Sequence, residues 1–133
     1  MAVQPDDFSG LRALFINCTL KRSPELSNTQ GLIDISTNIM EKHGVEVEVV
    51  RAVDHDIATG VWRDMREHGW AADDWPMIFE KVVAAEILVL AGPIWLGDNS
   101  SLIGQECSQA AKAIYPAVHD LTCGWPPTPR LAV

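Results

Sequence analysis

Positive charge is scarce in this sequence. Its 133 residues contain 10 Lys and Arg against 18 Asp and Glu, which gives a formal net charge of −8. A broad basic face able to neutralise many phosphate groups is therefore not expected, so we expect no nucleic-acid partner. One small cationic loop is still enough to hold a single phosphate.

Cysteine and long apolar runs are also scarce. Cys18, Cys107 and Cys123 form no C-x-x-C pair and leave one thiol over, which favours a reducing compartment. Residues 1–10 contain two acids and no apolar run, so we expect no signal peptide. The longest apolar stretch, residues 87–94, is too short to span a bilayer. We therefore expect a cytoplasmic protein with no membrane contact.

Length and composition favour one globular domain, because 47% of the residues are apolar and 21% are charged. The predicted elements alternate along the chain: a strand at 11–16, a helix from Ser27 to Gly44, a strand at 45–50, a helix at 76–84, a strand at 86–91 and a helix after Ser100 or Ser101. Residues 51–74 are predicted to mix irregular chain with a short helix. This order predicts an α/β fold with a doubly wound parallel sheet.

Three of these elements also carry predictions about burial. In the first helix, four apolar residues at helical spacing are expected to face the core: Leu32, Ile35, Ile39 and Met40. Four polar residues are expected to face water: Asn28, Asp34, Asn38 and Glu41. The alternating run at 45–50 (VEVEVV) is typical of an edge strand, whereas the apolar run at 86–91 (EILVLA) is typical of a strand buried on both faces.

A phosphate site is predicted in the loop after the first strand. In open α/β sheets, ligands bind beyond the carboxyl ends of the strands where the strand order reverses, here between the first and third strands. Residues 17–29 place hydroxyls and cations before a helix N-terminus: Thr19, Lys21, Arg22, Ser23, Ser27 and Thr29. The alternative is that Ser27 only caps the helix and the cations are solvated. Neither a Walker A loop nor a G-x-G-x-x-G fingerprint is present.

The loop at residues 92–101 is predicted to receive a flat ring. Pro93, Ile94, Trp95 and Leu96 place apolar side chains at a strand end where a polar turn is usual, and Gly97 permits close backbone approach. The alternative is that Trp95 belongs to the core and covers the sheet.

The segments CTLKRSPELSNT and AGPIWLGDNSS, each at the end of an apolar strand, resemble the NADPH-dependent FMN reductase family of flavodoxin-like proteins over residues 10–105. The resemblance implies that the FMN phosphate is held by Thr19, Lys21, Ser27, Asn28 and Thr29. It implies that the isoalloxazine ring is lined by Pro93, Ile94, Trp95, Leu96 and Gly97.

By this resemblance, the chain is an FMN-binding oxidoreductase that passes hydride from NAD(P)H through the flavin to a small acceptor such as a quinone. Residues 1–105 would form a flavodoxin-like core with strands in the order 2-1-3. Residues 106–133 depart from the family and form an atypical tail, so the sheet would be incomplete and the chain would form a homo-oligomer. The alternative is a truncated, non-catalytic α/β fragment that binds flavin weakly or not at all.

The sequence does not support two other groups of residues as functional sites. Cys18 lacks the arginine six positions later that a low-molecular-weight phosphatase needs, because Pro24 stands there. Asp54, His55 and Asp56 are adjacent in the sequence and are not expected to converge on one metal ion. We predict no metal site and name no catalytic side chain.

Overall fold

The computed structural model describes residues 7–60, 62–95, 97–99, 101 and 103–104. Their elements follow in this order: β1 (Arg12–Asn17), α1 (Asn28–Lys42), β2 (Glu46–Arg51), the 3-10 turns η1 (Ala52–Asp54) and η2 (Met65–His68), α2 (Trp75–Ala84), β3 (Ile87–Ala91), β4 (Ile94–Trp95) and β5 (Asp98–Asn99). The predicted strands and helices within these residues are confirmed, with bounds shifted by one or two positions. The predicted helix after Ser100 and the tail at 106–133 lie largely or wholly outside the described residues.

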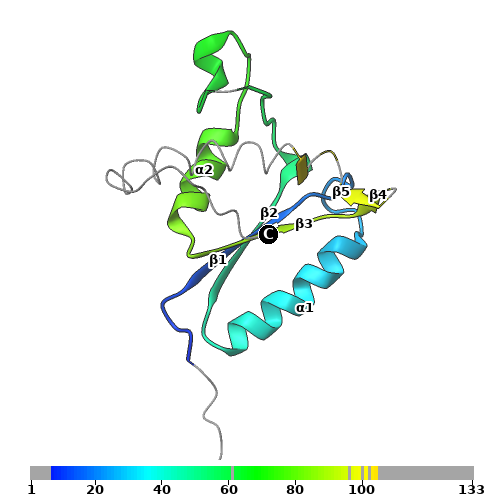
Figure 1. Cartoon of the computed structure of the whole chain (residues 1–133), viewed down its shortest axis with the longest axis vertical. Helices are drawn as coiled ribbons and strands as arrows, with labels where there is room; N and C mark the ends of the chain where they lie inside the picture. The colour runs from blue at the N-terminus through cyan, green and yellow to red at the C-terminus, as the bar shows by residue number, and fades with distance from the viewer. Residues whose placement is uncertain (1–6, 61, 96, 100, 102, 105–133) are drawn as a thin grey trace, which may run out of the picture.

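The first three strands form a parallel sheet in the order β2-β1-β3 (Figure 1). Asn17 at the end of β1 lies opposite Arg51 of β2 and opposite Ala91 of β3. The carboxyl ends of all three strands therefore meet at one edge, and the chain leaves β1 and β3 from adjacent positions. The predicted 2-1-3 order and the α/β class are confirmed.

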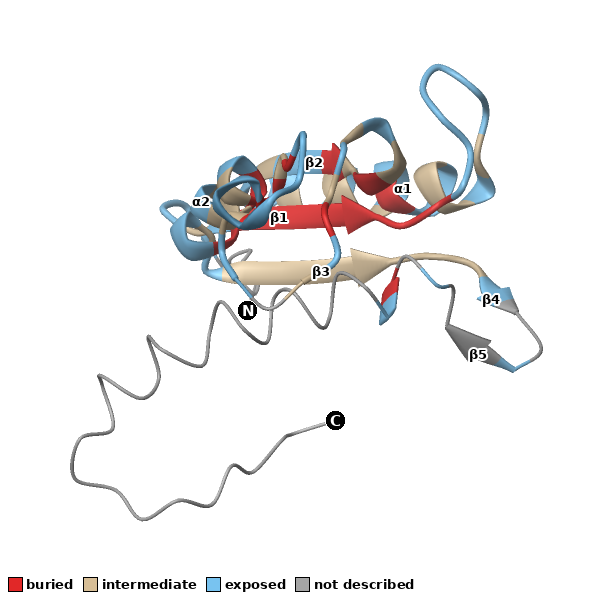
Figure 2. Cartoon of the chain, turned by 90° about the horizontal axis from the view of Figure 1, so that it is seen from above, coloured by how far each residue is buried: buried red, intermediate tan, exposed pale blue. Residues whose placement is uncertain are grey.

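The core lies on both faces of β1, because alternate β1 residues point to opposite sides of the sheet. On one face, Leu14 and Ile16 pack with Trp75, Ile78 and Val82 of α2. On the other face, Ala13 and Phe15 pack with Ile33 of α1. Figure 2 shows β1 buried along most of its length, and Figure 1 shows the two helices on opposite sides of the sheet.

The buried face of α1 differs from the predicted one. Ile33 is the buried residue of this helix, and Met40, seven positions later, packs beside it; Met40 is the one of the four predicted residues that faces the core. Leu32, Ile35 and Ile39 are 69%, 60% and 54% exposed. The predicted helical period is right but its phase is wrong, because Ile33 and Met40 lie on a different side of the helix from the more numerous apolar residues. The polar residues expected to face water are exposed.

Strand β3 is less buried than predicted. All five of its residues are of intermediate burial, and among the described residues the strand lies at an edge of the sheet (Figure 2). The alternating strand β2 lies at the other edge, as predicted. The segment after β3, predicted as a loop, contains a short hairpin in which β4 pairs with β5 in antiparallel register.

Residues 55–60 and 62–74 form a lobe between η1 and α2 that projects beyond the end of α2 (Figure 1). Its centre is the buried carboxylate of Asp73, which accepts hydrogen bonds from the backbone N–H groups of Ala58, Met65 and Trp75 at 3.2, 3.0 and 3.0 Å. This one side chain therefore joins the start, the middle and the end of the lobe. Trp62 and Trp70, both in this lobe, are exposed.

Candidate functional site

The two loops singled out in the sequence begin side by side. The backbone N–H of Cys18 donates a hydrogen bond of 2.7 Å to the carbonyl of Ala91, which continues the β1–β3 pairing into the loops. Gly92 follows directly, and a Cβ atom on it would lie 2.5 Å from Ile103 Cδ1 and 3.2 Å from Cys18 Cβ. A side chain at this position would displace Ile103 and crowd Cys18, so glycine lets the second loop leave the sheet beside the first without disturbing either residue.

The N-terminus of α1 is open to a ligand. Ser27 is the N-cap, as predicted, and its hydroxyl accepts a hydrogen bond from the N–H of Gln30 at 3.4 Å. The N–H groups of Asn28 and Thr29 have no hydrogen-bond partner within the described part of the chain. These two donors lie at the positive end of the helix dipole, where an anion is stabilised.

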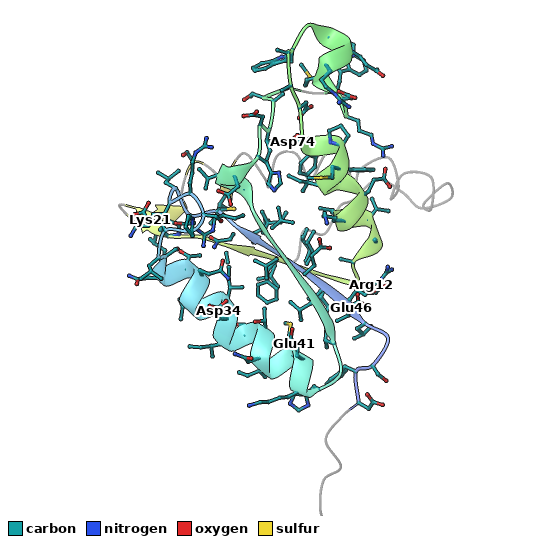
Figure 3. The ribbon with its side chains drawn as sticks, turned by 180° about the vertical axis from the view of Figure 1, so that it is seen from behind. Arg12, Lys21, Asp34, Glu41, Glu46 and Asp74 are labelled. Atoms are coloured by element: carbon teal, nitrogen blue, oxygen red, sulfur yellow. The ribbon has the colours of Figure 1, made fainter. Side chains whose placement is uncertain are left out.

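Lys21 places its ammonium group at this helix end. Its Nζ donates to the carbonyl of Leu26 at 3.1 Å and lies 3.7 Å from a carboxylate oxygen of Glu25. Figure 3 shows Lys21 at the end of the sheet that carries the β4–β5 hairpin. The lysine is half-exposed, so it can turn to a ligand, but Glu25 competes with any anion for it. The sequence did not single out this competing carboxylate.

Thr19 is buried close to the strand end. Its hydroxyl accepts a hydrogen bond of 3.4 Å from the N–H of Lys21, and its own N–H donates to Asn17 Oδ1 at 3.0 Å. Asn17 is fully buried, and its Nδ2 donates to Gln30 Oε1 at 2.8 Å. Asn17 therefore ties the strand, the loop and the helix together at the base of the predicted phosphate site.

The second loop forms a tight hairpin at the same end of the sheet. Gly97 has a φ of 81°, a conformation that favours glycine, and it turns the chain from β4 into β5. Pro93 precedes this hairpin, and Ile94 within it is 76% exposed. The structure places the backbone of Trp95 in β4, and Leu96 lies outside the described residues.

Apolar surface is also exposed on the first loop, which the sequence prediction missed. Leu20 is 50% exposed and Leu26 is 88% exposed. With Ile94 they provide apolar side chains on both loops at this edge of the sheet. The signal was present in the sequence, because leucines inside a polar loop are unusual, but periodicity analysis passes over isolated residues.

Two further residues at this edge come from the β2 side, and neither was predicted as part of the site. Arg51 Nη1 donates to the carbonyls of Lys21 and Glu25, both at 3.2 Å. Asp54 accepts hydrogen bonds from Ser23 Oγ at 2.5 Å and from Ser23 N at 2.9 Å. These hydrogen bonds, the hydroxyl one foremost, hold the pKa of the Asp54 carboxyl below its ordinary value.

The other candidate groups have structural partners. Asp54 is engaged with Ser23, while His55 Nδ1 lies 3.5 Å from a carboxylate oxygen of Asp74. Within the described residues, no three potential ligand side chains gather into a metal-binding group. None of the described helices has the length and apolar character needed to cross a membrane.

No protein-family model matches the chain. In sequence, it is similar to the divalent metal cation transporter MntH of Mycobacterium bovis, with 68% identity over 102 residues that make up 77% of this chain and 15% of that protein. It is also similar to 8-demethyl-8-aminoriboflavin-5'-phosphate synthase of Streptomyces davaonensis, with 48% identity over 93 residues, or 65% of this chain and 35% of that protein.

Among solved structures, the chain matches RosB with the bound intermediate 8-demethyl-8-formylriboflavin-5'-phosphate. The TM-score is 0.60 and the identity is 38%, over 88% of this chain and 45% of that one. The chain thus spans less than half of each of these proteins. Over the shared part it is homologous to RosB, and its fold is flavodoxin-like.

Proposed function

We propose that the chain binds a flavin 5'-phosphate, with FMN as the first candidate, across the edge where β1 and β3 end. One observation carries the proposal: an open helix N-terminus with a lysine beside it adjoins exposed apolar side chains of a second loop. A flavin phosphate has an anionic end and a flat apolar end, so it is complementary to such a site. The homologous RosB holds a flavin phosphate in its crystal structure, which supports the same ligand class here.

The residues of the first loop would bind the phosphate. The unpartnered N–H groups of Asn28 and Thr29 and the ammonium of Lys21 would donate to its oxygens, with the hydroxyls of Thr19 and Ser27 beside them. To do so, Lys21 would have to give up its ion pair with Glu25. This ion pair is exposed, its Nζ–Oε1 distance is 3.7 Å, and such pairs contribute little to stability.

The residues of the second loop would line the ring: Pro93, Ile94, Trp95, Leu96 and Gly97. The exposed leucines of the first loop, Leu20 and Leu26, add apolar surface on the opposite side of the edge. Covering such side chains removes apolar area from water, and this burial would favour the flavin over free phosphate.

For the reaction, we propose transfer of a hydride from NAD(P)H to the flavin and of two electrons onward to a small acceptor such as a quinone. When bound, the flavin supplies this chemistry, and the chain supplies binding and orientation. We further propose that the chain acts in the cytoplasm as a homo-oligomer. The alternative of a non-catalytic fragment remains part of the test, since the chain spans less than half of RosB.

A second candidate is that the flavin phosphate is the substrate. The synthase from Streptomyces davaonensis, 48% identical in the shared part, is named for making 8-demethyl-8-aminoriboflavin-5'-phosphate. The chain is incubated with FMN, NAD(P)H and a quinone in one reaction and with FMN, an amino donor and oxygen in another, because replacing the 8-methyl group by an amino group needs a nitrogen source and an oxidant for the departing carbon. Following the flavin by chromatography with mass detection separates the two functions. A changed flavin mass supports modification, whereas oxidation of NAD(P)H with an unchanged flavin supports electron transfer.

Binding is tested by titrating FMN with the chain and following the quenching of flavin fluorescence. We expect Lys21→Ala to raise the Kd about tenfold, since one charge-assisted contact with the phosphate contributes about 1.4 kcal/mol. Lys42→Ala, which removes the same charge from the far end of α1, is the matched control. Absence of binding by the wild-type chain would refute the proposed function, and equal constants for wild type and Lys21→Ala would remove Lys21 from the site.

A further inference from the structure

The loop between β1 and α1 is exposed yet fixed from outside. Residues 20–26 are all exposed, and exposed segments with few buried contacts are ordinarily the first parts of a protein to open. Here the loop is held at three positions by Arg51 and Asp54, which follow one another closely at the end of β2 and in η1. We call these two side chains the clamp.

The clamp fixes the direction of particular peptide groups. The carbonyls of Lys21 and Glu25 both point to the Arg51 guanidinium. The peptide bonds that follow these residues are trans, so the N–H groups of Arg22 and Leu26 point away from Arg51. The clamp therefore turns carbonyl oxygens, which repel an anion, toward β2 and leaves N–H donors on the other side of the loop.

Asp54 holds the middle of the same loop. It receives both the N–H and the hydroxyl of Ser23, so its carboxylate takes up donors on the β2 side. Gln30, in the first turn of α1, completes the arrangement: its Oε1 accepts from buried Asn17 at 2.8 Å and lies 3.5 Å from Arg51 Nη2. The clamp is thereby connected to the strand end on which the loop stands.

We propose that Arg51 and Asp54 are positioning residues that hold residues 21–25 in the conformation that receives the flavin phosphate, without touching the phosphate themselves. This inference rests on the proposed function. It assigns a role to two residues outside both predicted loops. It also requires that the carboxylate of Asp54, which is bonded to the loop between β1 and α1, promotes the binding of an anion.

Asp54→Ala separates positioning from simple electrostatics. Removing a negative charge near the site favours an anion, so an electrostatic role alone predicts tighter FMN binding. Positioning predicts the opposite, an FMN Kd raised about tenfold, because the loop must be ordered again at each binding event. Asp56→Ala is the matched control, because it removes the same charge two residues away. The hydrogen bonds between Asp56 and Asp74 use the backbone of Asp56 and not its side chain, so we expect this variant to leave the Kd for FMN unchanged.

Two additional measurements complete the test. Riboflavin, which lacks the phosphate, should bind the wild type and Asp54→Ala equally. Arg51 Nη1 serves both carbonyls while Nη2 reaches Gln30 Oε1. Arg51→Lys keeps the charge but offers a single nitrogen on a shorter side chain, so it loses this two-nitrogen arrangement and should weaken FMN binding nearly as much as Arg51→Gln. Full recovery with lysine would overturn the positioning role of Arg51.

Hydrogen exchange of the loop amides in the 133-residue chain without flavin tests the clamp by itself. We expect the peptide covering residues 18–27 to exchange about tenfold faster in Asp54→Ala than in wild type or Asp56→Ala. Unchanged exchange overturns the clamp, whether or not flavin binds. A wild-type chain that shows the protected loop but no FMN binding overturns the proposed function, and with it the role of the clamp in holding a flavin phosphate.

Discussion

Replacing Asp73 with alanine should destabilise the chain more than any substitution on its exposed surface. Asp73 is 5% exposed, and its carboxylate accepts hydrogen bonds from three backbone N–H groups, those of Ala58, Met65 and Trp75. Alanine leaves these donors without their partner in a buried place. Each such donor costs about 1–3 kcal/mol, and release of the desolvated carboxylate offsets part of the sum. We expect a loss of about 3 kcal/mol.

The graded variant is Asp73→Asn. Its single carbonyl oxygen can replace Oδ1, which serves Ala58 and Trp75, but an NH2 group then faces the N–H of Met65. One donor is lost instead of three, so we expect a loss of about 1–2 kcal/mol. Both values are large against the total stability of about 5–15 kcal/mol that is usual for a domain.

The measurement is urea unfolding followed by tryptophan fluorescence, with thermal unfolding beside it. For a chain of this length, 3 kcal/mol lowers Tm by about 10 °C. Asp64→Ala is the control in the same lobe. That carboxylate bonds the exposed side chain of Arg66 and accepts one backbone N–H, that of Arg66 at 3.0 Å, instead of three, so its loss should cost about 1 kcal/mol. If Asp73→Ala loses no more than this control, the three amides are satisfied by water and the reasoning is wrong.

Three further predictions concern the ring, acid pH and the sheet edge. Trp95→Ala should shift the visible spectrum of bound FMN and raise its Kd; an unchanged spectrum and affinity would show that Trp95 only packs. Hydrogen bonds from the backbone N–H and side chain of Arg12 hold the pKa of the Glu86 carboxyl below its ordinary value. The ionised carboxylate therefore stabilises the fold at neutral pH, and this stabilisation is lost as the pH falls below about 4. In urea unfolding, Glu86→Gln should be less stable than wild type at pH 7 and equal to it near pH 2. Among the described residues β3 lies at an edge of the sheet, and this edge should lead to self-association in sedimentation; a stable monomer that binds FMN stoichiometrically would contradict this.

The parts of the fold that local chemistry determines were predictable. Ser27 caps α1 and Gly44, with a φ of 88°, ends it, because both roles depend on one residue's own conformational preference. The meeting of the two loops followed from strand order alone, since parallel strands joined by right-handed crossovers place their carboxyl ends together.

The buried side of α1 was not predictable by counting apolar residues. Leu32, Ile35 and Ile39 share one side of the helix and outnumber the buried residues on the other. Which side meets the sheet is decided by the whole chain, including the way Gln30 bonds to Asn17, and a sequence pattern fixes only the period.

The clamp escaped prediction for a similar reason. Arg51 and Asp54 lie about thirty positions from the carbonyls and the serine that they hold, and nothing in their own neighbourhood marks them. Sequence reasoning grouped Asp54 with His55 and Asp56 because they are adjacent. In the structure, Asp54 and His55 have different partners, Ser23 and Asp74.

The pairing of Asn17 with both Arg51 and Ala91 also sets an order of events in folding. Ala91 lies 74 positions from Asn17, whereas Arg51 lies 34 positions away, so closing the chain between β1 and β3 costs more entropy than closing it between β1 and β2. We expect β1, α1 and β2 to associate first and the β3 pairing to form late. During synthesis, Arg51 and Asp54 can then bond the loop between β1 and α1 before the β4–β5 hairpin, which is proposed to line the flavin ring, has docked. If a flavin needs both loops, as proposed, it would bind only after β3 has paired with β1, and by mass action its binding would stabilise β3.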